Sequence, residues 1–87
     1  MAKLTINGRD YTIAKHRKYG RYIMVQIEHV TPGMALDQGR FVARVPGTVN
    51  GQENPRTWEI RLDSGMSYIE SRSTDERLTR VRVWIDE

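Results

Sequence analysis

Residues 79–85, near the end of the chain, constrain the fold more than any other segment. One set of alternate side chains suits a buried face and comprises Thr79, Val81, Val83 and Ile85, whereas the other comprises Arg80, Arg82 and Trp84. Successive side chains of a β-strand point to opposite faces of its sheet, so this alternation is typical of a half-buried strand. The segment therefore predicts a β fold with a basic, aromatic outer surface.

Turn-forming residues recur at short intervals along the chain and support the same fold class. Asn7-Gly8 favours a type I′ turn, which predicts a hairpin between strands at residues 3–6 and 9–16. We expect further turns at residues 18–21 and 63–65, where a glycine follows polar or aromatic residues. Alternating or β-branched runs predict the remaining strands at 22–30, 40–45, 57–62, 66–71 and 79–85.

Three segments have a less regular pattern. Residues 31–39 fit either a type II turn centred on Pro32-Gly33 or one helical turn that ends before Gly39. Pro46-Gly47 predicts the end of the strand at 40–45, and residues 46–56 predict the longest loop. Residues 72–78 contain a capping-box pattern and predict a tight turn or a very short helix.

These elements predict one all-β domain over residues 1–87, with six or seven short antiparallel strands and at most one short helix. Curling the sheet strongly, or closing it into a small SH3-like or OB-like barrel, would cover one apolar face and limit exposed edges. The predicted inner face comprises Leu4, Ile6, Tyr11, Ile13, Ile23, Val25, Ile27, Phe41, Ala43, Val45, Trp58, Ile60, Leu62, Val81, Val83 and Ile85.

The composition excludes several classes of chemistry. The chain has no cysteine, which excludes disulfides, thiolate nucleophiles and zinc sites built from cysteine. His16 and His29 lie far apart, and no nucleophile motif accompanies them. We therefore expect no catalytic residue, no metal site and no cofactor.

Because no segment approaches the ~18 apolar residues of a membrane-spanning helix, and the N-terminus lacks a signal-peptide pattern, we expect a cytoplasmic protein without a membrane partner.

Positive charge is concentrated near the N-terminus. Residues 1–22 carry six cations and one anion, a net charge of +5, within a chain of net charge +3. Inside this region Lys15, Arg17, Lys18 and Arg21 surround Tyr19. Lysine and arginine neutralise phosphates, and aromatic rings stack on unpaired bases, so the cluster is a candidate nucleic-acid site. The alternative is a solvated hairpin tip.

Arg80, Arg82 and Trp84 form a second candidate site on the outer face of the last predicted strand. Tryptophan and arginine are frequent hot-spot residues of protein interfaces, and an indole can also stack on a base. The alternative is a structural role, in which Arg82 packs on the Trp84 ring or the arginines pair with Glu59 or Glu70.

Two functions follow, both non-enzymatic. The first is a protein-interaction module, acting as a homodimer, an adaptor or an inhibitor of a larger partner, with an interface at Arg80, Arg82, Trp84 and residues 46–56. The second is a nucleic-acid-binding module, in which Lys15, Arg17, Lys18 and Arg21 contact phosphates while Tyr19 and Trp84 stack on bases. The mixed charge outside the N-terminal quarter favours protein interaction.

Overall fold

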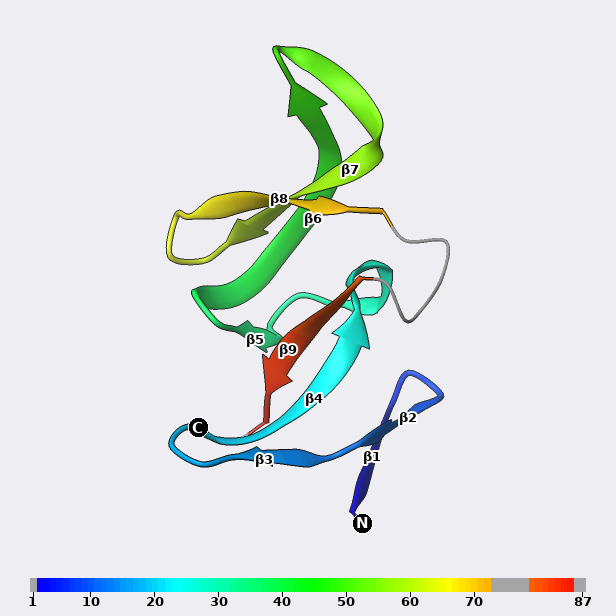
Figure 1. Ribbon diagram of the computed structural model, residues 1–87, viewed down its shortest axis with the longest axis vertical. Helices are drawn as coiled ribbons and strands as arrows, with labels where there is room; N and C mark the ends of the chain where they lie inside the picture. The colour runs from blue at the N-terminus through cyan, green and yellow to red at the C-terminus, as the bar shows by residue number, and fades with distance from the viewer. Residues whose placement is uncertain (1, 73–78, 86–87) are drawn as a thin grey trace.

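The computed structural model describes residues 2–72 and 79–85, and these residues form an all-β structure, as predicted (Figure 1). The predicted turn or short helix at residues 72–78 falls almost entirely outside them. The described strands are β1 (Lys3–Ile6), β2 (Arg9–Thr12), β3 (Ala14–His16), β4 (Gly20–Gln26), β5 (Ala35–Leu36), β6 (Gly39–Val49), β7 (Gln52–Leu62), β8 (Ser67–Ser71) and β9 (Arg80–Trp84). One turn of 3-10 helix, η1 (Ile27–His29), follows β4.

These strands form two antiparallel sheets. β1 and β2 make a separate two-stranded sheet, whereas the other seven strands have the order β3-β4-β9-β5-β6-β7-β8. The C-terminal strand β9 therefore lies between β4 and β5. Figure 1 shows β6 leading from the half that holds β4 and β9 to the half that holds β7 and β8. The two sheets are not closed into a barrel, because among the described strands β3 and β8 each have only one neighbour.

Glycines with positive φ angles close the predicted hairpins. Asn7 and Gly8 have φ angles of 51° and 78°, as the type I′ turn between β1 and β2 requires. Gly65, with a φ angle of 88°, ends the three-residue turn before β8, and Gly20, with a φ angle of 99°, is the first residue of β4, directly after the turn at residues 17–19. These turns lie where the sequence predicted them.

Residues 31–34 resolve the ambiguity left by the sequence. Gly33 has a φ angle of 97°, and the N–H of Met34 donates to the carbonyl of Thr31 over 3.2 Å. With Pro32 at the second position, this is the type II turn. The alternative of a helical turn ending at Gly39 is wrong, because the chain forms the short strand β5 instead.

Two predicted strands have different bounds in the structure. The strand predicted at 9–16 is divided near Ile13, where the chain leaves β2 in one sheet and enters β3 in the other. The strand predicted at 22–30 ends at Gln26, because η1 turns the chain there. The Arg44 guanidinium donates to the carbonyls of Ile27 and Val30 over 3.0 and 2.9 Å and so satisfies two acceptors of this turn.

The prediction of a long loop at 46–56 is wrong. β6 continues to Val49 and β7 begins at Gln52, so a two-residue Asn50-Gly51 turn joins them with φ angles of 55° and 79°. Pro46 and Gly47 mark a register shift within β6 instead of its end. Gly47 is buried at this point, and a Cβ atom there would collide with the hydroxyl of Thr57.

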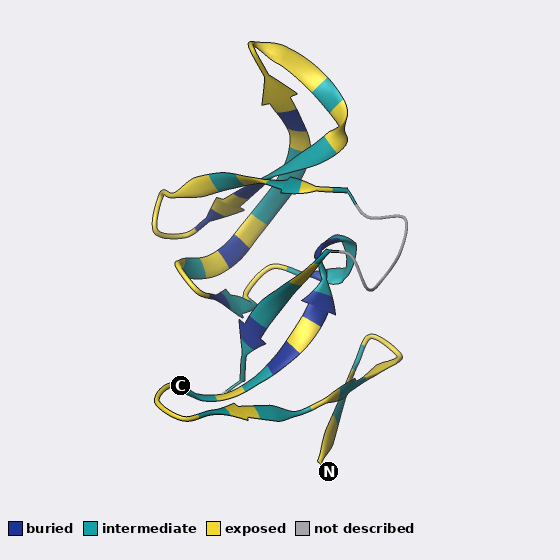
Figure 2. Ribbon diagram, viewed as in Figure 1, coloured by how far each residue is buried: buried dark blue, intermediate teal, exposed yellow. Residues whose placement is uncertain are grey.

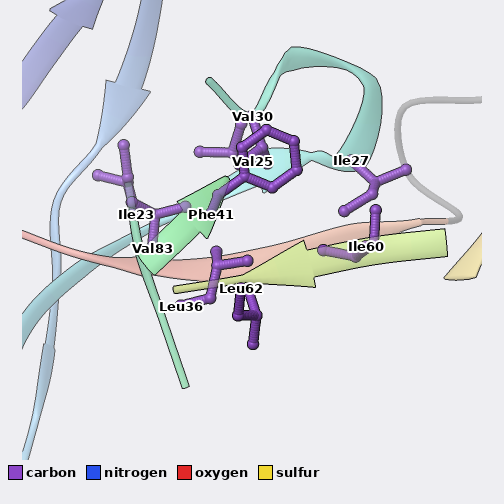
Figure 3. Packing of buried hydrophobic residues seen from close by; sticks show 9 residues of the cluster. All are labelled: Ile23, Val25, Ile27, Val30, Leu36, Phe41, Ile60, Leu62 and Val83. Carbon is purple, nitrogen blue, oxygen red and sulfur yellow. The ribbon is translucent and has the colours of Figure 1, made fainter. Parts of the chain in front are cut away.

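The core lies between the two halves of the seven-stranded sheet. Figure 3 shows its nine buried residues, Ile23, Val25, Ile27, Val30, Leu36, Phe41, Ile60, Leu62 and Val83. Several other predicted core residues pack against this cluster while half-buried, namely Leu4, Ile6, Tyr11, Ile13, Trp58, Val81 and Ile85. The sequence did not predict Val30 or Leu36. Figure 2 shows the buried segments along β4, β9 and β6.

Ala43 and Val45 do not belong to the inner face, contrary to prediction. A register shift between Phe41 and Ala43 reverses the alternation along β6. Arg44 then lies opposite Ile60 on the inner face, and Val45 lies opposite Glu59 on the outer face. This one bulge therefore reverses the facing of the side chains from Ala43 up to the second register shift at Pro46-Gly47.

Candidate functional site

The outer face of β4 and β9 carries the second candidate site. The strand predicted at 79–85 is present as β9, and its register with β4 places Tyr22 opposite Trp84, Met24 opposite Arg82 and Gln26 opposite Arg80. Directly opposed residues share a face, so these six side chains lie together on the outer surface. The alternate residues, Ile23, Val25, Val81 and Val83, face the core.

Aromatic rings from the β3–β4 hairpin surround Trp84. The ring centroids of Tyr22, His16 and Tyr19 lie 5.4, 5.8 and 6.0 Å from that of Trp84, each in an edge-to-face arrangement. This geometry is favoured by the charge distribution of aromatic rings. We call His16, Tyr19, Tyr22 and Trp84 the aromatic cluster. The cluster joins the N-terminal candidate region to the C-terminal strand.

Arg82 and Asp37 hold the aromatic cluster in place. The guanidinium carbon of Arg82 lies 4.8 Å from the centre of the Tyr22 ring and 5.2 Å from that of Trp84. The indole N–H of Trp84 donates to a carboxylate oxygen of Asp37 over 2.8 Å. The structure thus contains the cation–π packing that the sequence suggested as the structural alternative for Arg82. Trp84 is half-buried, whereas 59% of Tyr19 is exposed, so Tyr19 is the more accessible ring.

The basic residues of the hairpin do not share one face. Lys15 lies opposite Arg21 in the register of β3 and β4, and both side chains lie on the face opposite to that of His16 and Tyr22. Arg17 and Lys18 occupy the turn, where the Lys18 ammonium lies 5.5 Å from the centre of the Tyr19 ring. The hairpin therefore presents its cations in two directions.

His16 has a structural role that the sequence did not predict. Its ring nitrogen Nδ1 accepts hydrogen bonds from the backbone N–H groups of Lys18 and Tyr19, over 3.1 and 3.3 Å. The side chain thus caps the turn and positions Tyr19 beside it, with the two ring centroids 5.0 Å apart.

Three adjoining hollows form a groove across this outer face. The middle hollow has a volume of about 510 Å³ and is lined by Met24, Leu36, Asp37, Gln38, Tyr68, Glu70, Arg80, Val81 and Arg82. A hollow of about 480 Å³ on one side shares Leu36, Asp37 and Arg82 with it and reaches Tyr19 and Trp84. A third, of about 440 Å³, shares Met24 and Arg80 with the middle hollow and is further lined by Arg9, Asp10, Tyr11, Thr12, Gln26 and His29.

The groove carries balanced charge. Its cations are Arg9, Arg80 and Arg82, and its anions are Asp10, Asp37 and Glu70. Burial raises the pKa of the Glu70 carboxyl above its ordinary value. Burial also raises the pKa of the Tyr68 hydroxyl, with smaller contributions from the negative charges of Glu70 and Asp37. The middle hollow is thus a partly desolvated site with both signs of charge.

Sequence reasoning identified only part of this groove. It selected Tyr19, Arg80, Arg82 and Trp84 and named Glu70 as a possible partner of the arginines, but it did not select Asp37 or Tyr68. Asp37 follows a two-residue strand, and β8 approaches β9 only through the curvature of the whole sheet. The sequence did contain a signal for the part of the groove on β4, because Tyr22, Met24 and Gln26 alternate with buried residues there.

Residues 46–56 were expected to contribute to the same interface, but none of them lines the groove. They form the end of the β6–β7 hairpin, at the end of the molecule away from β3 (Figure 1).

No model of a protein family, no curated protein and no solved structure matches the chain. Within residues 2–72 and 79–85, no three histidine or acidic side chains gather as metal ligands would. The same residues contain no helix with the length and apolar character that crossing a membrane requires.

Proposed function

We propose that this chain is a non-enzymatic binding module whose groove docks an extended segment of a partner protein. The observation that carries the proposal is the continuous groove on the outer face of β4 and β9, with an aromatic end and balanced charge. Interfaces of proteins are enriched in tyrosine, tryptophan, methionine and arginine, and Tyr19, Trp84, Met24 and Arg82 all line this groove.

The arrangement of the hollows favours an extended ligand. The middle hollow shares residues with both of the others, whereas the outer two share none, so they lie in a row. An extended peptide advances about 3.3 Å per residue and can place side chains in successive hollows. The end at Tyr19 and Trp84 suits an apolar side chain of the partner, and the middle suits charged side chains of either sign.

Nucleic acid is the alternative partner, and one observation favours it. Arg17 and Lys18 lie in the turn next to the exposed ring of Tyr19, with Lys15 and Arg21 on the adjoining strands. A single strand could contact these cations and stack on that ring. The carboxylates of Asp37 and Glu70 weigh against a phosphate backbone inside the groove, because like charges repel strongly in a partly desolvated site.

Selection from a random peptide library displayed on phage tests the proposal. Peptides of about 12 residues would span about 40 Å when extended, more than the roughly 23 Å that the seven residues of β4 extend beneath the groove. We expect selected peptides to bind wild-type protein and to lose about tenfold or more in affinity with Arg82→Ala. Arg61→Ala is the matched control, because Arg61 is exposed, pairs with Glu59 and does not line the groove. Failure to select any peptide, or equal losses in both variants, would contradict the proposal.

Arg82→Ala and a second variant, Arg17→Ala/Lys18→Ala, distinguish a protein partner from a nucleic-acid partner. If nucleic acid is the ligand, retention on single-stranded DNA should fall steeply between about 50 and 200 mM salt, because bound counterions are released. Retention should then disappear in the double variant Arg17→Ala/Lys18→Ala and persist in Arg82→Ala. That result, together with an absence of peptide binding, would replace the proposal by its alternative.

The SH3-like or OB-like barrel type and the cytoplasmic location remain predictions from the sequence. The curvature that lets residues of β8 and β9 line one hollow supports a strongly curled sheet.

A further inference from the structure

β8 is an open edge of the seven-stranded sheet. It pairs with β7 alone among the described strands, and no other backbone hydrogen bond of the described residues involves Ser67–Ser71. The strand at the other end of the sheet, β3, has only three residues and includes Lys15. Short edges and lysine side chains discourage pairing with another chain. β8 has neither protection.

The hydrogen bonds beside β8 show which of its backbone groups point away from β7. The N–H of Leu62 donates to Met66 over 3.0 Å, and the N–H of Arg72 donates to Arg56 over 2.7 Å. In an antiparallel ladder, hydrogen-bonded pairs alternate with pairs that are not bonded. Tyr68 and Glu70 therefore bond to β7, and the N–H and C=O groups of Ser67, Ile69 and Ser71 point outward.

The side chains of β8 also leave the edge open to pairing. Residues 67–71 contain no lysine, arginine or proline, and no register shift interrupts the pairing with β7. Ile69 is 46% exposed at the centre of the strand. The one charged residue of the strand is Glu70, which is half-buried beside the groove, and the lysine, proline or bulge that natural edge strands often use to prevent association is absent from Ser67–Ser71. An edge of this kind can accept another strand.

We propose that the partner of this edge is β8 of a second copy of the chain, in an antiparallel dimer centred on Ile69. The order Ser-Tyr-Ile-Glu-Ser is self-complementary in this register. Ile69 faces Ile69 of the second copy, Ser67 faces Ser71, and Tyr68 faces Glu70. A two-fold axis requires such a self-matching surface.

In this register the outward-pointing backbone groups find hydrogen-bond partners, and so does the Glu70 carboxylate. Ser67, Ile69 and Ser71 point outward and would form the three hydrogen-bonded pairs, which exchange about six backbone hydrogen bonds. Tyr68 and Glu70 would form the pairs that are not backbone-bonded, where side chains approach more closely, and the Tyr68 hydroxyl can donate to the Glu70 carboxylate. No like charges oppose each other. Tyr68 and Glu70 also line the middle hollow, so this interface adjoins the groove, but the dimer proposal does not depend on the groove-binding proposal.

Sedimentation equilibrium tests the dimer. Because a five-residue strand pair is a small interface, we expect a concentration-dependent dimer with a dissociation constant in the range of about 10 µM to 1 mM. Ile69→Lys places two like charges opposite each other and should leave the protein monomeric. Val49→Lys is the matched control, because Val49 is also 46% exposed but lies at the end of β6. A monomer at every concentration, or an equal effect of both substitutions, would overturn the proposal.

Cross-linking tests the register. Because the chain has no native cysteine, only the introduced cysteines can form disulfides. Under mild oxidation, a mixture of Ser67→Cys and Ser71→Cys proteins should form the mixed disulfide faster than either protein forms its own. Comparable rates in all three samples would overturn this register. Hydrogen exchange adds a readout without substitution: the amides of Ser67 and Ile69 should gain protection as concentration rises, while that of Tyr68 should stay protected throughout. Protection independent of concentration would count against the dimer.

Discussion

The environment of Glu70, which lines the middle hollow of the groove, determines how readily its carboxyl is protonated. Burial raises the pKa of its carboxyl in the folded chain, so folding favours the protonated form. The resulting stabilisation is complete below the ordinary pKa, near 4.5, and is lost as the pH rises through the higher pKa of the folded state. Glu70 lines the same hollow as Arg80 and Arg82. Its burial there makes the folded chain less stable at neutral pH than at acidic pH, as far as this group contributes.

Replacing Glu70 by glutamine should remove this dependence on pH. Relative to wild type, the free energy of unfolding of Glu70→Gln should increase as the pH rises from about 4 to 7, because glutamine does not ionise. Urea unfolding at several pH values measures the difference. Ser71→Ala is the control, and its difference from wild type should stay constant over the same range. A Glu70→Gln difference that falls with pH would contradict the assigned environment.

Hairpins are the elements that the sequence predicted best. Asn7-Gly8 and residues 63–65 fix their turns because glycine or asparagine must adopt a positive φ angle there. Asn50-Gly51 carries the same signal, but it stands among Pro46, Gly47, Asn54 and Pro55, and these residues together predict a loop. The sequence pattern does not distinguish a glycine that turns the chain from one, like Gly47, that makes room for a neighbouring strand. The sequence pattern also did not reveal the bulge between Phe41 and Ala43 in β6. This bulge places Val45 on the face opposite to the predicted one.

Gly47→Ala should destabilise the β6–β7 hairpin by about 1–3 kcal/mol, because the added methyl group collides with the Thr57 side chain. In a Thr57→Ala background the same substitution should cost less, since the hydroxyl it meets is gone. A double-mutant cycle by urea unfolding measures the coupling. Equal costs in the two backgrounds would show that Gly47 is not required for this close approach.

The molecule as a whole brings distant segments into one surface. β9 lies between β4 and β5, which places Trp84 beside the β3–β4 hairpin, and the curvature of the sheet places residues of β8 and β9 around one hollow. Local patterns predicted the strands and the outward direction of Arg82 and Trp84, and they suggested Glu70 as a possible partner of the arginines. They contained no information on strand order, so Asp37 and Tyr68 could not be assigned to the same groove. The surface that we propose as a docking site therefore depends on the topology.

The most direct test of the groove as a docking site is a titration of isotope-labelled protein with a selected peptide, followed by amide chemical shifts. We expect the perturbed amides to cluster around the three hollows, from Tyr19 and Trp84 past Arg82 to Glu70 and Met24, while Asn50 and Gly51 at the far hairpin stay unchanged. Perturbations confined to the β6–β7 hairpin, or to residues 15–18 alone, would contradict this expectation.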